Sequence, residues 1–128
     1  MRRVFLMLLL ALASGSAAAQ WVAAGRSTLF NAYFDPASIR RGGDMVTMWH
    51  LYDFNTAKQS PDGQSYNSSK EQAEYDCKDE QVRLLSFSWH AGPMGTGAIV
   101  TAEAEVSRWL PVAPKSIYAA LWKRACEK

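Results

Sequence analysis

Residues 45–54 read Met-Val-Thr-Met-Trp-His-Leu-Tyr-Asp-Phe, and this stretch decides the fold class. Apolar and aromatic side chains occupy both alternate sets of positions, which is typical of a strand covered on both faces at the centre of a sheet. Trp49 and Leu51 share one face. The opposite face carries Val46, Met48, Tyr52 and Phe54. The sequence therefore predicts a central β-strand with two apolar faces to bury.

Further strands are predicted on both sides of this stretch. They cover residues 28–34, 68–77, 82–90 and 98–106, which are rich in β-branched or aromatic residues or alternate between apolar and polar positions. Turn sequences rich in glycine, proline and aspartate separate these strands. Residues 55–66 are polar and contain Ser-Pro-Asp-Gly, so we expect a loop there.

The only predicted helix lies at the C-terminus. Ser116 is a favourable N-cap residue, and apolar side chains then recur at a spacing of four in two neighbouring stripes: Ile117, Leu121 and Ala125, and Tyr118, Trp122 and Cys126. We therefore expect an α+β fold. It consists of an antiparallel sheet of about five or six strands with one C-terminal helix packed on a face.

The N-terminal residues carry the pattern of a secretory signal peptide. Met1-Arg2-Arg3 is basic, residues 4–13 are apolar, and residues 17–19 are alanines. A membrane anchor is the alternative, but ten apolar residues fall short of the roughly twenty that a membrane-spanning helix needs. We predict a signal peptide at residues 1–19 with cleavage after Ala19. Residues 20–128 then form a single domain that is exported to the periplasm or cell surface without a membrane anchor.

The cysteine content fits an exported domain. The chain has two cysteines, Cys77 and Cys126. An even number in an exported chain of this size is typical of a disulfide, and two free thiols are the alternative. A disulfide would join the helix to the strand that ends at Cys77, so we expect a disulfide-linked fold.

The charge balance argues against one class of partner. The chain of 128 residues has 14 Lys and Arg and 12 Asp and Glu. Residues 1–19 contain two arginines and no acidic residue, so the predicted mature domain carries 12 positive and 12 negative side chains. A domain without net charge lacks the basic character typical of nucleic-acid-binding proteins. We expect no nucleic-acid partner.

Two histidines are candidates for a metal site. His50 and His90 each follow a tryptophan within a predicted strand, and Asp53 lies close to His50 in sequence. Zinc needs three or four ligands in a recognisable cluster, and this spacing does not form one. We interpret both histidines as strand residues and expect no bound metal.

Other patterns that resemble catalytic or cofactor sites also have structural explanations. A phosphate loop leads directly into a helix N-terminus, whereas residues 92–97, which contain three glycines, lead into a strand pattern. Glu103 and Glu105 share one strand face, whereas the paired carboxylates of glycosidases flank a cleft from different elements. We therefore expect a protein that is not an enzyme and has no cofactor.

The aromatic content offers a binding surface. The chain has five tryptophans, which pack in a core or line an exposed patch. Both faces of the 45–54 strand need cover, and one terminal helix covers only one of them. Our hypothesis is that a homodimer or another protein partner closes the second face. The candidate partner surface comprises Trp49, Leu51, Lys70 and Arg83.

Several short motifs occur in a defined order along residues 20–128. They are Tyr33-Phe34-Asp35-Pro36-Ala37-Ser38-Ile39, Trp49-x-Leu51-x-Asp53-Phe54, Ser69-Lys70, Glu74-Tyr75-Asp76-Cys77, Gly92-Pro93-Met94-Gly95-x-Gly97, Trp109-x-Pro111-x-x-Pro114-x-Ser116, and Leu121-Trp122 with Cys126. In this order the chain resembles the surface-adhesin protein E family of Gram-negative bacteria. The resemblance implies an antiparallel sheet, a packed C-terminal helix, a disulfide between the matching cysteines, and binding of host extracellular-matrix proteins.

The sequence departs from the adhesin that gives this family its name in two respects. That adhesin resembles a lipid-anchored protein with a basic binding segment around its first cysteine. Here no cysteine lies near the predicted cleavage site, and residues 68–85 carry three basic against five acidic side chains. The alternative function is therefore a periplasmic structural or assembly protein with no host contact.

Overall fold

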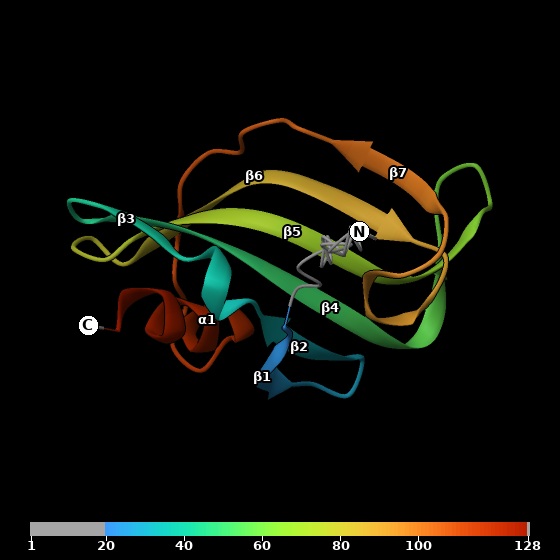
Figure 1. Cartoon of the computed structure of the whole chain (residues 1–128), viewed down its shortest axis with the longest axis horizontal. Helices are drawn as coiled ribbons and strands as arrows, with labels where there is room; N and C mark the ends of the chain where they lie inside the picture. The colour runs from blue at the N-terminus through green and yellow to red at the C-terminus, as the bar shows by residue number, and fades with distance from the viewer. Residues whose placement is uncertain (1–19, 128) are drawn as a thin grey trace, which may run out of the picture.

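The computed structural model describes residues 20–127. The predicted signal peptide, residues 1–19, lies outside the described residues. One antiparallel sheet with the strand order β1-β2-β4-β5-β6-β7 dominates the described chain, and a single α-helix, α1 (Ile117–Cys126), lies against it (Figure 1). The α+β class and the C-terminal helix predicted from the sequence are therefore confirmed.

The eight strands alternate with short turns and two 3₁₀ turns. The short strand β3 pairs with β4, and β8 pairs with β6. The elements in chain order are β1 (Val22–Arg26), β2 (Phe30–Phe34), η1 (Pro36–Ser38), β3 (Arg40–Gly42), β4 (Met45–Gln59), β5 (Ser65–Asp76), β6 (Gln81–His90), η2 (Pro93–Gly95), β7 (Ile99–Glu103), β8 (Leu110–Pro111) and α1.

The expected count of five or six strands is wrong, because three strands carry little side-chain signal. β1 has the sequence Val-Ala-Ala-Gly-Arg, in which small residues replace the β-branched and aromatic residues that indicate a strand. β3 and β8 have only three and two residues, too few to show a period of two. Backbone pairing with β2, β4 and β6 forms these strands rather than a pattern of their own.

The expected loop at residues 55–66 is also wrong. β4 continues to Gln59 and β5 begins at Ser65, so the two strands extend as a polar hairpin beyond the rest of the sheet. Only the connection between them is a turn, in which the Gly63 N–H donates to the Ser60 carbonyl and Gly63 has a φ of 84°. Residues 55–59 are exposed, so the hydrophobic pattern that marks a buried strand is missing there.

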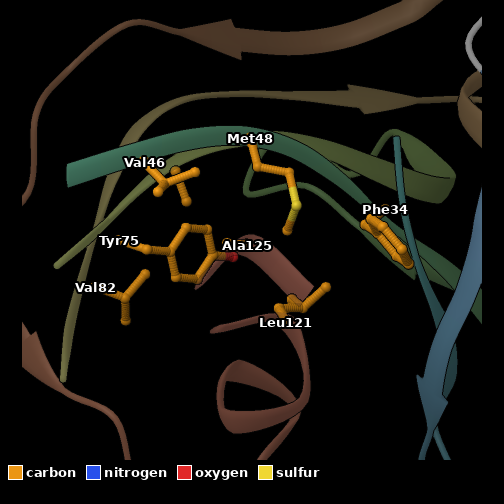
Figure 2. Packing of buried hydrophobic residues seen from close by; sticks show 8 residues of the cluster. Phe34, Val46, Met48, Tyr75, Val82, Leu121 and Ala125 are labelled. Carbon is orange, nitrogen blue, oxygen red and sulfur yellow. The ribbon is translucent and has the colours of Figure 1, made fainter. Parts of the chain in front are cut away.

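The core lies between α1 and the sheet. Ser116 caps the helix, since its Oγ accepts a hydrogen bond from the Ala119 N–H. Leu121 and Ala125 are fully buried. Figure 2 shows both facing the side chains of Phe34, Val46, Met48, Tyr75 and Val82. Ala73 completes this buried core cluster. The predicted spacing of four residues thus produces the buried stripe of α1.

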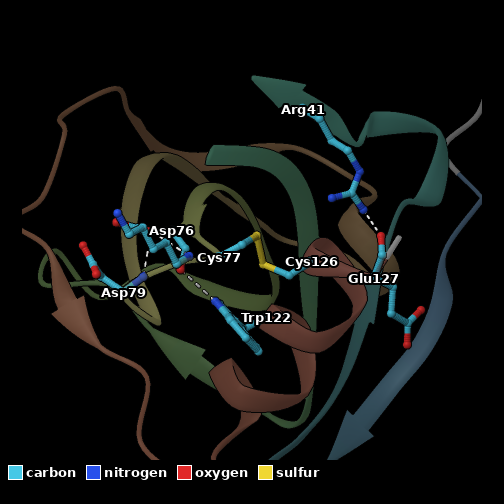
Figure 3. Close-up of a disulfide and its surroundings, with 8 residues drawn as sticks. Arg41, Asp76, Cys77, Asp79, Trp122, Cys126 and Glu127 are labelled. Carbon is cyan, nitrogen blue, oxygen red and sulfur yellow. Dashed lines mark hydrogen bonds between the residues drawn. A yellow bond between two sulfur atoms is a disulfide. The ribbon is translucent and has the colours of Figure 1, made fainter. Parts of the chain in front are cut away.

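A disulfide fixes the C-terminal end of α1 to the sheet. Cys77 and Cys126 are bonded with a Cα–Cα distance of 5.6 Å, as the sequence predicts (Figure 3). The Trp122 indole N–H donates to the Asp76 carbonyl at 3.0 Å, one residue before the bridge. A second contact comes from Arg41, whose guanidinium donates to the Glu127 carbonyl. The disulfide and two hydrogen bonds therefore fix the C-terminal end of α1 to the sheet.

Candidate functional site

The strand register divides the sheet into two faces. We call the side that α1 covers the helix face; it carries Val46 and Met48 of β4. The opposite side is the open face. It carries Trp49 on β4, Lys70 on β5 and Arg83 on β6, because these residues alternate with those that face the helix. Leu51 pairs with Lys70 and lies on the same side, so all four residues predicted to form a partner surface share one face.

Two tryptophans of the open face lie next to cations. The Lys70 ammonium is 5.6 Å from the centre of the Trp49 ring, and the Arg83 guanidinium carbon is 4.4 Å from the centre of the Trp109 ring. Arg83 also donates to a Glu74 carboxylate oxygen at 2.8 Å through Nε. This ion pair and the ring contact give the guanidinium a defined orientation on the surface.

A shallow groove of about 340 Å³ lies beside Trp49. Trp49 forms one of its walls. The rest is lined by residues of β6 and of the chain at the end of β7, which are Ser86, Phe87, Ser88, Ala102, Glu103 and Ala104. Four of these side chains are small, and Trp49 is half-buried rather than covered. The groove joins an aromatic wall to hydroxyl groups, a combination suited to holding a partner's side chain.

The prediction that Leu51 belongs to an accessible partner surface is wrong. It is fully buried. η2 folds over it so closely that a Cβ added to Gly95 would lie 3.0 Å from Leu51 Cδ1. Asp53 accepts from the Met94 N–H at 2.9 Å and Ser68 Oγ accepts from the Gly95 N–H at 2.8 Å, which fixes η2 in place. The chain therefore covers part of its own second face, and only the remainder is available to a partner.

Trp109 is a surface residue that sequence reasoning missed. It lies between β7 and β8, in a segment without a strand or helix pattern. Its place on the open face follows from its contact with Arg83 and from the pairing of Leu110 with Val82. The sequence shows only a tryptophan in an irregular segment, and this does not indicate on which face of the sheet the side chain lies.

The polar residues of the open face do not form a catalytic triad. Ser88 Oγ and His90 Nε2 lie 2.8 Å apart, as in a nucleophile–base pair. Burial lowers the pKa of His90, and the charge of Lys70 lowers it further. The second ring nitrogen, Nδ1, is buried without a hydrogen-bond partner, so the histidine lacks the carboxylate that orients a triad.

The two candidate metal-binding histidines lie on opposite faces of the sheet. His50 pairs with Glu71 of β5 and His90 with Ser68, three positions apart on the same strand. Asp53 is engaged by the η2 backbone. Within residues 20–127, no three side chains of His, Cys, Asp or Glu are arranged to hold a metal ion.

A buried polar cluster connects α1 to the helix face. His50 is fully buried, and its Nε2 lies 2.7 Å from a Glu71 carboxylate oxygen. The Tyr118 hydroxyl of α1 donates to the same oxygen at 3.5 Å. Tyr75 Oη lies 3.4 Å from His50 Nδ1. These contacts place a polar anchor beside the apolar core, and they make the helix contact sensitive to tyrosine ionisation.

We expect the domain to lose stability in alkali through this cluster. Burial and, secondarily, the Glu71 charge raise the pKa of Tyr118 to about 12. Folding raises this pKa, so the protonated Tyr118 hydroxyl stabilises the fold. This stabilisation is fully present below pH ~10, the pKa of an unfolded tyrosine, and is lost as the pH rises towards 12. Tyr118→Phe should flatten the fall of unfolding free energy between about pH 10 and pH 12, measured by urea denaturation. An equally steep fall in both proteins would contradict this assignment.

A row of aromatic rings occupies the helix face beyond the core under α1. Phe54 contacts Phe30 and Tyr66, and Tyr66 stacks on Trp89 with ring centres 4.4 Å apart. Phe87 contacts Trp89 in turn. Sequence reasoning placed Tyr66 in a loop and so did not predict this row. The rings pack edge to face or stacked across β2, β4, β5 and β6, which stiffens the half of the sheet that the helix leaves uncovered.

No helix among the described residues is both long and apolar enough to span a membrane. No curated protein sequence matches the chain significantly. The fold is similar to solved structures of Haemophilus influenzae protein E. Crystal form II of that protein has 12% identity and a TM-score of 0.64, and the alignment covers 86% of this chain and 96% of that chain. A second structure of it has 14% identity, a TM-score of 0.58 and coverage of 84% and 93%.

Protein E from non-typeable Haemophilus influenzae gives a similar result, with 14% identity, a TM-score of 0.57, and coverage of 79% of this chain and 80% of that chain. At these identities the likeness concerns the fold. The family evidence is broader, because the model of the family described as surface-adhesin protein E matches residues 21–127. This match spans nearly all of the described chain and confirms the resemblance seen in its motifs. The chain belongs to the surface-adhesin protein E family.

Proposed function

We propose that this chain is an exported, non-catalytic domain that binds another protein through its open face, and that the partner is a host extracellular-matrix protein. The observation that carries the proposal is the pair of tryptophan–cation contacts on that face, Trp49 with Lys70 and Trp109 with Arg83. Tryptophan and arginine are the residues most enriched at the energetic centres of protein interfaces. Membership of an adhesin family supports the same class of function.

The geometry of the open face suits a protein partner better than a small substrate. The groove beside Trp49 is shallow, and the ionic residues Lys70, Glu74 and Arg83 surround the aromatic rings. An apolar centre with a charged rim is the usual anatomy of a protein interface. The open face would also serve a homodimer. A monomeric mass in sedimentation at micromolar concentration would argue against a dimer.

The proposal predicts that truncating the open-face anchors weakens binding. Arg83→Ala and Trp49→Ala should each weaken binding to a panel of immobilised extracellular-matrix proteins by about 30-fold, or ~2 kcal/mol, because both remove interface anchors. Surface plasmon resonance with the purified domain measures this.

Arg124→Ala is the matched control. Arg124 also lies over an aromatic ring, that of Phe34, but on α1. Its loss should leave binding unchanged. Absence of binding to every matrix protein, or equal binding by the wild type and Arg83→Ala, would contradict the proposal.

The acidic balance of residues 68–85 favours a second candidate, a periplasmic structural or assembly protein. Such a protein would use the same open face but would never meet the host. Accessibility on intact cells distinguishes the two candidates, since a periplasmic domain is shielded by the outer membrane.

A further inference from the structure

A second groove lies between β1 and α1, away from the open face described above. It has a volume of about 500 Å³ and is bounded by the end of β1 on one side and by one row of helix residues on the other. Arg26, Lys115 and Lys123 line it, and none of the described residues that line it is acidic. All three cations are exposed.

These three cations have no carboxylate partner in the part of the chain that the structure describes. The ion pairs there are His50 with Glu71 and Arg83 with Glu74. Three unpaired positive charges that converge on one groove create a local positive potential, even in a domain whose total charges balance. The charge of the groove therefore selects an anionic occupant.

The shape of the groove favours an extended occupant over a single small ion. Lys123 lies six positions after Ile117, which corresponds to about 9 Å along the helix axis. Lys115 precedes the helix and Lys123 lies near its end, so the positive charges are spread along the groove. Its floor carries small side chains, with Gly25 on β1 and Ala119 and Ala120 on α1.

The lining also decides between classes of polyanion. Single-stranded nucleic acids bind grooves in which bases stack on aromatic rings, and no aromatic side chain lines this groove. A flat lipid surface does not enter a groove between a strand and a helix. We propose that this groove binds an extended acidic polysaccharide through its sulfate, phosphate or carboxylate groups. The site is separate from the open face, so it stands or falls independently of the proposed protein partner.

The test measures binding of a heparin octasaccharide to the purified domain by isothermal titration calorimetry at low and at high salt. The wild type should bind at low salt and lose affinity as salt rises, because the contacts are ionic. The triple variant Arg26→Gln/Lys115→Gln/Lys123→Gln should bind at least about tenfold more weakly.

The control variant Lys58→Gln/Lys78→Gln/Arg108→Gln removes the same charge from three exposed residues outside the groove. It should retain wild-type affinity within about twofold. Thermal unfolding verifies that both variants are folded. Three outcomes would overturn the proposal: no octasaccharide binding by the wild type, an equal loss in the control variant, or binding to phosphatidylglycerol vesicles without binding to the octasaccharide.

Discussion

Reduction of the Cys77–Cys126 disulfide should lower the free energy of unfolding by about 4 kcal/mol. The bridge joins residues separated by 49 positions, and in the chain-entropy model a closed loop of this length restricts the unfolded state by roughly that amount. The loss is large compared with the total stability of a small domain, which is about 5–15 kcal/mol. Urea denaturation with and without dithiothreitol measures it.

The double variant Cys77→Ser/Cys126→Ser provides the control for this experiment. It should match the reduced wild type in stability and should not respond to dithiothreitol, because it contains no thiol. Trp122 lies beside the bridge and donates to the Asp76 carbonyl, so its fluorescence reports release of the helix end. A change of less than about 1 kcal/mol on reduction would show that noncovalent packing alone holds α1.

Leu121→Ala should destabilise the domain by about 3 kcal/mol. Leu121 is fully buried where α1 meets Met48 and Tyr75, and truncation leaves a cavity that neighbours on a paired sheet fill only in part. The expected effect combines the lost burial of the removed methyl groups with the cost of that cavity. Denaturation in urea at neutral pH, with the disulfide intact, measures the change.

The matched truncation is Leu29→Ala. Leu29 is 64% exposed, so removing its side chain should change stability by no more than about 0.5 kcal/mol. Equal effects at both positions would contradict the placement of α1 against the sheet. A large effect at Leu121 alone supports the helix–sheet core as the source of stability.

The central strand, the helix and the disulfide could be predicted because side-chain pattern alone determines them. The 45–54 stretch is apolar on both faces, and β4 does lie inside the sheet between β2 and β5. Ser116 followed by apolar residues at a spacing of four marks α1 without any knowledge of its partners. The chain has two cysteines, which leave a single intramolecular pairing.

The elements that depend on tertiary pairing could not be predicted. β1, β3 and β8 exist because a neighbouring strand offers hydrogen-bond partners, and their own residues are too few or too small to indicate this. The burial of Leu51 also depends on tertiary structure, because η2 folds over it. The three glycines of residues 92–97 are typical of a turn, but the position of this turn over β4 depends on hydrogen bonds that the Met94 and Gly95 N–H groups donate to Asp53 and Ser68, and only the folded chain forms them.

The candidate site could be predicted only where its residues lie on regular strands. Trp49, Lys70 and Arg83 lie on regular strands, where alternation together with register determines the face. Trp109 lies in an irregular segment, where no period applies. The unpaired cations of the second groove come from β1 and the residues around α1, which are far apart in sequence and meet only in the fold.

The most direct test of a host-binding function is protease treatment of intact cells of the native organism, compared with cells whose outer membrane has been permeabilised. The proposal predicts that the mature domain is cleaved on intact cells, because a surface adhesin must reach the medium to meet the host matrix. Protection until permeabilisation, with an outer-membrane protein cleaved and a periplasmic protein intact as controls, would contradict it. The domain would then act on a partner within the periplasm.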